Sequence, residues 1–192
     1  VSGIPPKGNG DLAWVQHMVK SMNSTGRMTV VLPHGAIFRP NAEARIRRYL
    51  IEHDLLEAVI GLGPNIFYGS PLATCIVVIK QNKEVNKKGK VLFVDASELF
   101  RVGRAQNHLE PLHVKQIHDW VSDYRDVENH TKIVCVKDIQ ENDFNLNIPL
   151  YVEKIVEDDL LSVEQAETEL KAAWEASLKA ERDFKSVLER FI

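Results

Sequence analysis

Cysteine is scarce in this chain, where Cys75 and Cys135 are the only two among 192 residues. Each lies inside an apolar run, Ala-Thr-Cys-Ile-Val-Val and Ile-Val-Cys-Val, which predicts buried, reduced core residues and excludes a disulfide framework. Long hydrophobic runs are absent too, so nothing in the sequence predicts a membrane span. The first ten residues show no charged-then-apolar secretory pattern. We therefore expect a cytoplasmic protein that does not enter a membrane.

An excess of positive charge is also missing. Lysine and arginine number 24 against 27 acidic residues, which gives a net charge of -3 and no overall basic field to attract nucleic acid. Any contact with DNA would then need a local basic patch or charge from a partner. The hydrophobic fraction of 44% and the charged fraction of 27% are ordinary for a globular chain, and the length suits one compact domain with a small appendage.

Motifs for metal and phosphate binding are not found. His108, His113 and His118 recur every five residues, which separates them by roughly 140° per step on a helix. No Cys-x-x-Cys or His-Glu-x-x-His spacing occurs. Gly61-Leu62-Gly63 resembles the start of a dinucleotide loop, but Ile66 takes the place of its third glycine, which favours a turn. The sequence therefore predicts no metal ligands and no cofactor-binding residues.

Hydrophobic periodicity predicts alternating helices and strands. The continuous apolar run at 28–32 is typical of a strand buried on both faces of a sheet. The order of elements predicts an α/β sheet of mixed strands that begins with parallel crossovers and ends with an antiparallel hairpin. We expect helices at 11–22, 42–53 and 111–122, and strands at 28–32, 55–62, 75–80, 91–94 and 131–136. The patterns for the helix at 111–122 and the strand at 131–136 are weaker than the others.

The end of the chain changes character. From residue 160 to 191, apolar residues alternate at spacings of three and four, which indicates a heptad-like stripe on one long helix. The helix either packs on its own domain or pairs with a partner, and pairing between two copies would give a homodimer. We place the domains at 1–150 and 151–192. The residues expected to contact a partner helix are Leu170, Trp174, Phe184, Val187 and Phe191.

Two segments carry candidate binding residues. The strand at 28–32 runs into Pro33-His34-Gly35, and ligands of open α/β sheets bind at the carboxyl ends of strands. The second segment, 63–71, joins two strands and contains the adjacent aromatics Phe67 and Tyr68. One of these rings can fill the core, and an exposed one can stack on a nucleic-acid base.

Taken in order, the motifs resemble the modification subunit of type I restriction–modification systems, a family of adenine-specific DNA methyltransferases. Each motif is short, but their order and spacing together are specific. The resemblance rests on Asp11-Leu12-Ala13-Trp14-Val15-Gln16-His17-Met18, Val31-Leu32-Pro33-His34-Gly35, Leu56-Glu57-Ala58-Val59-Ile60-Gly61-Leu62, Asn65-Ile66-Phe67-Tyr68-Gly69, Asn145-Leu146-Asn147-Ile148-Pro149 and the helical tail.

The resemblance implies a Rossmann-like methyltransferase sheet, of which this chain supplies the later half, and transfer of a methyl group from S-adenosylmethionine to adenine. The target base must leave the duplex to be reached, so the enzyme needs a pocket for it. Phe67 and Tyr68 would form part of the pocket wall, and Pro33, His34 and Gly35 would lie near its floor. The tail would pack on a specificity subunit, and a restriction (motor) subunit would join for cleavage.

Two parts of the family pattern are not in this sequence. One is the glycine-rich cofactor loop, and the other is the catalytic Asn-Pro-Pro-aromatic segment. Ile4-Pro5-Pro6-Lys7 is not a substitute, because Ile4 has no side-chain acceptor for the adenine amine and Lys7 has no ring to hold the base. We therefore expect a C-terminal portion of the enzyme, without catalytic residues, that neither binds S-adenosylmethionine nor methylates DNA by itself.

Arginines on and just before the second predicted helix provide candidate DNA-phosphate contacts: Arg39, Arg45, Arg47 and Arg48. A solvated helix face is the other reading of this group. The alternative function is a non-enzymatic interaction module that pairs through its C-terminal helix. Half of a doubly wound sheet would also leave one strand edge unpaired, which predicts self-association of the isolated chain.

Overall fold

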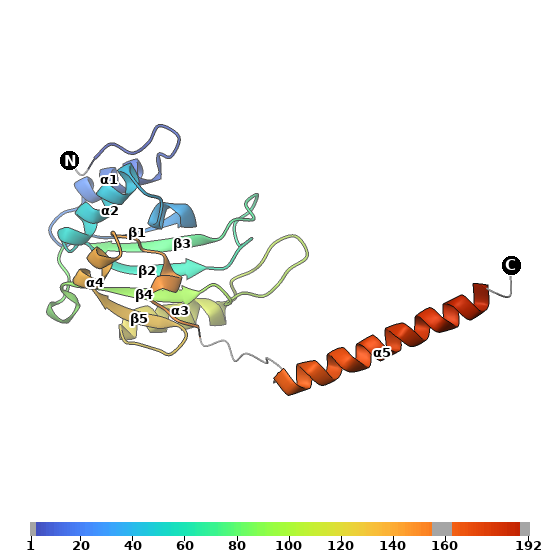
Figure 1. The fold of residues 1–192 in the computed structure, drawn as a ribbon. Helices are drawn as coiled ribbons and strands as arrows, with labels where there is room; N and C mark the ends of the chain where they lie inside the picture. Colours follow the sequence, from blue (N-terminus) through green and yellow to red (C-terminus); the bar gives the residue numbers. More distant parts are fainter. Residues whose placement is uncertain (1–2, 155–162, 189–192) are drawn as a thin grey trace. The chain divides into compact units, whose positions relative to one another are not determined.

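The computed structural model describes residues 3–154 and 163–188 (Figure 1). The chain separates into two compact units, 1–155 and 156–192, and each is described by itself. Tyr151 and Val152 belong to the first unit, because the ring of Tyr151 stacks on Phe93 with 4.2 Å between centroids and Val152 is buried. The sheet unit thus continues past the boundary predicted at residue 150.

A five-stranded mixed sheet forms the first unit (Figure 1). The strand β3 is antiparallel to both β1 and β2, β2 runs parallel to β4, and β5 is antiparallel to β4. The predicted α/β class with mixed strands is confirmed. In spatial order the strands are β1 (Arg27–Pro33), β3 (Thr74–Lys80), β2 (Leu56–Leu62), β4 (Lys90–Ala96) and β5 (Thr131–Cys135).

The predicted strand pairing was wrong in two places. No hairpin joins β3 and β4, because β2 lies between them and the connection 81–89 crosses over it. Likewise β1 and β2 point the same way but do not touch, since β3 is inserted between them. Both β2 and β4 are almost wholly buried, and a central position covers such strands on both faces.

Helices cover both faces of the sheet. The helices α1 (Asp11–Ser21) and α2 (Ala42–Glu52) pack on one face, together with Ile139 of α4 (Val136–Glu141) and Ile148 of η3 (Ile148–Leu150). On the other face α3 (Pro111–Asp123) packs through Ile117 and Trp120. Short 3₁₀ turns, η1 (His34–Ile37) and η2 (Val85–Lys87), complete the connections.

Two burial predictions were also wrong. The strand β1 lies at the edge of the sheet, where its residues alternate between inside and outside, and the side chain of Val31 is 47% exposed. Cys75 is buried in the middle of the sheet as predicted, but Cys135 is exposed because it ends the opposite edge strand, β5. A local apolar run predicts a strand, but only its neighbours decide how many of its faces are covered.

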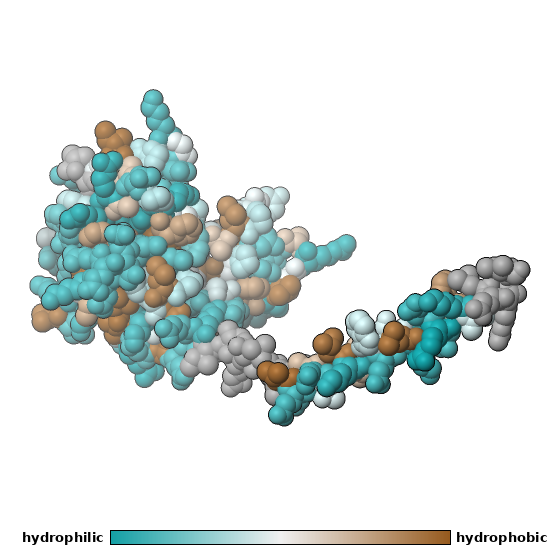
Figure 2. Space-filling model, in the orientation of Figure 1, coloured by the Kyte–Doolittle hydropathy of each residue, from teal (hydrophilic) through white to brown (hydrophobic). Residues whose placement is uncertain are grey.

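The second unit contains the helix α5 (Val163–Leu188), which has 26 residues. Figure 2 shows hydrophobic residues at intervals along it. Leu170, Trp174 and Phe184 are between 63% and 66% exposed, so the predicted stripe is solvent-facing in the single chain. Val187 lies within α5 but its side chain, like Phe191, falls outside the described residues. Among the described residues, no helix combines the length and apolar character needed to cross a membrane.

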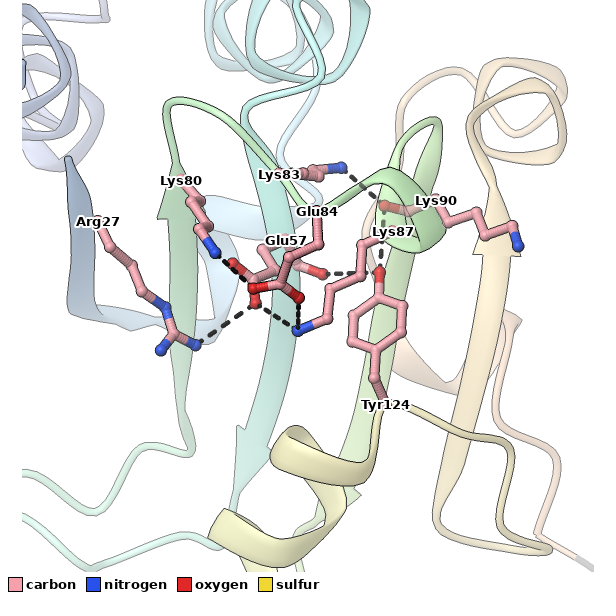
Figure 3. A network of polar contacts seen from close by, with 8 residues as sticks. All are labelled: Arg27, Glu57, Lys80, Lys83, Glu84, Lys87, Lys90 and Tyr124. Carbon is pink, nitrogen blue, oxygen red and sulfur yellow. Dashed lines mark hydrogen bonds and ion pairs between the residues drawn. The ribbon is translucent and has the colours of Figure 1, made fainter. Parts of the chain in front are cut away.

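A network of charged side chains closes the edge of the sheet where β2 begins (Figure 3). The buried carboxylate of Glu57 accepts from Lys87 at 3.2 Å and from Arg27 at 3.5 Å. The hydroxyl of Tyr124 donates to the carbonyls of Glu57 and Lys90, and the Lys87 ammonium lies 4.7 Å from the centre of its ring. Because these groups bond one another, the loops at the opposite edge are the better candidates for a binding site.

Candidate functional site

Both candidate segments meet at one edge of the sheet. The strands β1, β2 and β4 run in the same direction, so their carboxyl ends lie together. Pro33 ends β1, and His34 and Gly35 follow it. Phe67 and Tyr68 lie in the connection 63–73 after β2, which we call the aromatic loop. The two segments touch, because the N–H of His34 donates to the carbonyl of Ala73 at 3.3 Å.

The His34 imidazole is partly buried at this edge. Its ring meets the ring of Phe38 edge-on, with 6.0 Å between centroids. Burial lowers the pKa of His34 because the charged form loses water, and the negative charge of Asp95 opposes this only in part. We therefore expect a neutral ring at pH 7, which can both donate and accept one hydrogen bond.

Asp95 and Lys154 lie where β4 reaches the same edge. The Lys154 ammonium is 3.3 Å from the Asp95 carboxylate and also bonds the Glu98 carboxylate at 2.7 Å. Burial acts to raise the pKa of Asp95, but hydrogen bonds from Ser97 and the Lys154 charge outweigh it and leave the pKa below its ordinary value. The ion pair ties the end of the first unit to the carboxyl end of β4.

The four candidate arginines have different environments. Arg39 is partly exposed, and it pairs with Glu43 at 3.0 Å and with Asp11 at 3.5 Å. Its guanidinium fills the space beside Gly35, where an added Cβ would lie 2.6 Å from a guanidinium nitrogen. Arg39 therefore holds the His34–Gly35 turn against α1 and α2.

Arg47 is not available for a phosphate contact. Its side chain is buried, and it donates to the carbonyls of Ala36 at 3.2 Å and Phe144 at 3.1 Å. Burial lowers the pKa of Arg47 to about 10, with Glu43 acting in the opposite direction. Arg45 and Arg48 do face solvent, although Arg48 pairs with Glu52 at 2.8 Å. The sequence analysis grouped Arg47 with the exposed Arg45 and Arg48, because the segment that buries Arg47 lies far along the chain.

The aromatic loop presents its two rings differently. The side chain of Tyr68 is 96% exposed, and that of Phe67 is 39% exposed. A tight turn follows them, in which the Ser70 N–H donates to the Phe67 carbonyl at 3.2 Å and Gly69 has φ of +73°. Exposure of Tyr68 leaves a flat ring free at the site.

A third segment, 97–110, was missed by the sequence analysis, and we call it the clamp loop. It follows β4 and lies beside the aromatic loop (Figure 1). The Asn107 side chain donates to the carbonyl of Pro64 at 2.9 Å, and its backbone N–H donates to the carbonyl of Asn65 at 2.7 Å. No local sequence signal marks these contacts, because the partners lie about 40 positions apart.

Metal ligands do not gather at this edge. Within residues 3–154 and 163–188, no group of three histidine, cysteine, aspartate or glutamate side chains is arranged to hold a metal ion. His113 instead accepts from the backbone N–H of Glu110 at 3.1 Å in the first turn of α3. The exposed aromatic ring and the neutral imidazole suit contact with an organic base.

A protein-family model matches most of the chain. This model, described as N-6 DNA Methylase, matches residues 1–159.

The chain belongs to the N-6 DNA methylase family.

Relatives within the family are methylase subunits of type I restriction enzymes. The MjaVII methylase subunit of Methanocaldococcus jannaschii is 34% identical over 88% of this chain and 30% of its own length. Among solved structures, the type I methyltransferase subunit of Streptococcus thermophilus is 36% identical, with a TM-score of 0.73 over 78% of this chain and 31% of that one. The chain thus spans about a third of the length of these relatives.

A further solved structure shows the same fold at lower identity. It comes from a study of complex assembly and conformational transition of the type I restriction–modification system, with 18% identity and a TM-score of 0.59 over 94% of this chain and 39% of that one. Together these neighbours place the sheet among Rossmann-like methyltransferases, and the expected fold class is confirmed.

The Gly61-Leu62-Gly63 turn does not form a cradle for S-adenosylmethionine, because the protein's own side chains fill the space beside both glycines. A Cβ at Gly61 would lie 2.7 Å from the end of the Ile148 side chain, and one at Gly63 would lie 2.4 Å from the ring of Phe100. Both glycines leave room for the protein's own side chains, whereas cofactor-binding glycines leave room for phosphate or cofactor atoms. We therefore assign no step of the chemistry to a cofactor held by these residues.

Proposed function

We propose that this chain supplies the target-base side of an adenine-specific DNA methyltransferase that uses S-adenosylmethionine, and that these 192 residues alone transfer no methyl group. One observation carries the proposal, which is that the Pro33–Gly35 turn and the exposed Tyr68 lie at a single edge of the sheet. Membership of the N-6 DNA methylase family supports it.

The proposed chemistry divides the work between this chain and other parts of the enzyme. Adenine N6 is a weak nucleophile, so it needs acceptors that bond its hydrogens and leave its lone pair free to attack. The Asn-Pro-Pro-aromatic segment that provides such acceptors in the family does not occur in this sequence. Phe67 and Tyr68 would instead stack against the extruded base and keep water from it. His34 and Gly35 would close the floor of the pocket.

The free edge of β1 fits a larger sheet. The carbonyl of Gly26 and the N–H of His34 both form hydrogen bonds on the side of β1 that faces β3. Along an antiparallel strand, the N–H and C=O groups of successive residues point alternately toward one neighbour and toward the opposite side. The backbone groups of Arg27, Thr29 and Val31 therefore point outward, away from β3. We propose that a further strand of the methylase sheet pairs with them, which would also cover the exposed face of Val31.

The helix α5 is our proposed contact with the specificity subunit. Leu170, Trp174 and Phe184 expose large apolar side chains on a 26-residue helix, and such a stripe gains stability by burial against another helix. The restriction (motor) subunit and DNA would join the assembled complex. Arg45 and Arg48 would add phosphate contacts beside the pocket. Pairing of two α5 helices in a homodimer is the alternative that the same exposed stripe favours.

A segment exchange tests the proposal. The matching segment of the Streptococcus thermophilus methyltransferase subunit, 36% identical, would be replaced by residues 1–154 of this chain. With its specificity subunit, the chimera is expected to transfer labelled methyl groups from S-adenosylmethionine to adenine in duplex DNA. The unmodified 192-residue chain, titrated with S-adenosylmethionine in a calorimeter, is expected to show no binding.

Controls separate function from folding. A chimera with Tyr68→Ala should keep its thermal unfolding midpoint and its affinity for S-adenosylmethionine but lose most of its methyl transfer, because Tyr68 is almost fully exposed. A chimera that folds and binds the cofactor but leaves adenine unmethylated would contradict the proposed function. Clear binding of S-adenosylmethionine by the isolated chain would contradict its proposed inactivity.

A further inference from the structure

We propose that the clamp loop holds the aromatic loop in place and supplies Arg104 as a phosphate contact, so that the two loops form one DNA-binding surface. This proposal concerns the same site as the proposed function and rests on it. Neither Arg104 nor the amide side chains of the clamp loop are among the candidate residues predicted from the sequence. The ligand is a DNA strand at the base that Tyr68 contacts.

Backbone hydrogen bonds and an ion pair hold the clamp loop in a defined conformation. Arg101 and His108 exchange two backbone hydrogen bonds of 2.9 Å, which closes the tip of the loop as in a hairpin. The Arg101 guanidinium also bonds the Glu110 carboxylate at 2.6 Å. At Gly103 an added Cβ would lie 2.2 Å from the carbonyl oxygen of Gln106, so the turn accepts only glycine there. The position of the tip is therefore fixed by the fold.

Side-chain amides join this tip to the aromatic loop from both sides. Gln106 donates to the carbonyl of Ile66 at 2.5 Å, next to Phe67 in the sequence. In the reverse direction, the Asn65 side chain donates to the carbonyl of Ala105 at 3.2 Å. Together with the two bonds of Asn107, four hydrogen bonds cross between the loops. Because these bonds hold the residues directly before Phe67 in the sequence, they also position the neighbouring Tyr68.

An apolar contact also joins the two loops. The ring of Phe100 lies against Gly63, at the start of the aromatic loop. On the aromatic loop, Gly63 directly precedes Pro64, Asn65 and Ile66, which make the hydrogen bonds to the clamp loop. Movement of one loop would therefore carry the other, and the two act as a unit.

The exposed residues on this unit have the chemistry of a nucleic-acid site. Tyr68 offers a ring that is 96% exposed, and Arg104 is exposed one residue before Ala105, to which the aromatic loop is bonded. Within the described part of the chain Arg104 has no ion pair, whereas Arg101 is held by Glu110. An exposed ring and a guanidinium without an ion pair, carried by two loops that are hydrogen-bonded to each other, suit contact with a base and a phosphate of one strand.

Fluorescence anisotropy of the 192-residue chain with a short fluorescein-labelled single-stranded oligonucleotide tests the surface. Arg104→Gln should weaken binding and lower the slope of log affinity against log salt by about 0.7, the value for one lost phosphate contact on a single strand. Tyr68→Ala should weaken binding about tenfold at every salt concentration. Lys88→Gln is the matched control, because it removes one exposed positive charge beside the start of β4, at the opposite edge.

The clamp itself is tested by coupling. Asn107→Ala removes the side-chain bond to Pro64, and in this background Tyr68→Ala should cost clearly less affinity than it does in the unmodified chain. Equal losses from Tyr68→Ala in both backgrounds would overturn the clamp. Equal effects of Arg104→Gln and Lys88→Gln, or binding that ignores both Arg104 and Tyr68, would overturn the surface.

The result of the anisotropy experiment can be distinguished from the result of the segment exchange. An active chimera combined with DNA binding that ignores Arg104 and Tyr68 would remove this surface and leave the proposed methyltransferase role standing. Binding through Arg104 and Tyr68 combined with a folded, inactive chimera would keep the surface and remove the enzymatic role. If a peptide or an anionic vesicle bound through the same residues and the oligonucleotide did not, the partner would not be DNA and the proposal would fail.

Discussion

The Arg47 guanidinium donates a hydrogen bond to the backbone carbonyl of Phe144, 97 positions further along the chain, at a distance of 3.1 Å. A second bond from the same group reaches the carbonyl of Ala36 at 3.2 Å. The side chain thus joins α2 both to the turn that follows β1 and to the segment that follows α4. Because these carbonyls lie in the interior, Arg47 has a structural role rather than the surface role expected from its neighbours.

Replacement of Arg47 should destabilise the fold. Arg47→Met leaves two carbonyls without their donor, and we expect the free energy of unfolding in urea to fall by about 2–4 kcal/mol. Arg45→Met is the control, since Arg45 is exposed, and it should change the unfolding free energy by no more than about 0.5 kcal/mol. Similar small effects of both substitutions would show that the buried bonds contribute little.

Acid should weaken the carboxyl edge of the sheet through Asp95. Its folded-state pKa lies below the ordinary value of 3.8, so it stabilises the fold above about pH 4, and this contribution is lost as the pH falls through the folded pKa. Asp95→Asn should cost about 1 kcal/mol at pH 7 and flatten the loss of stability below pH 4. Chemical unfolding at a series of pH values measures both effects.

Substitution of Lys154, the ion-pair partner of Asp95, tests whether the ion pair contributes to the stability of the fold. Lys154→Met should produce a smaller loss at pH 7, because Lys154 is partly exposed and Ser97 still bonds the Asp95 carboxylate. The double variant should lose less than the sum of the two single losses. Strictly additive losses would mean that the ion pair makes no contribution.

The two cysteines should react at different rates. Burial raises the pKa of the Cys75 thiol to about 12, so almost no thiolate forms there at neutral pH, whereas Cys135 is exposed. A maleimide reagent should therefore label Cys135 in the folded chain and label both residues in urea, as read by mass spectrometry of peptides. Rapid labelling of Cys75 under native conditions would mean that the centre of the sheet opens readily.

The exposed stripe of α5 predicts self-association of the isolated chain. If two helices pair, sedimentation should show a dimer that Leu170→Glu or Phe184→Glu dissociates, because each places a charge on the apolar stripe. Thr168→Glu, also exposed and on the polar side of the helix, should leave the dimer intact. A monomer insensitive to all three changes at high concentration would exclude a paired helix.

Much of this fold and of its family follows from the sequence alone, because local periodicity and short motifs are properties of neighbouring residues. Helical periodicity predicted α1 and α2, short apolar runs predicted the first four strands, and several short motifs taken in order gave the resemblance to the family. These features depend on spacing along the chain, which the sequence states directly.

Only the tertiary structure decided which segments meet. It inserted β3 between β1 and β2, left Val31 and Cys135 at open edges, and buried Arg47 beside an exposed Arg48. It also brought Asn107 to Pro64 and so added a second loop to the site. Such contacts join residues tens of positions apart, and they form because a buried donor, acceptor or apolar face must find a partner wherever the folded chain places one.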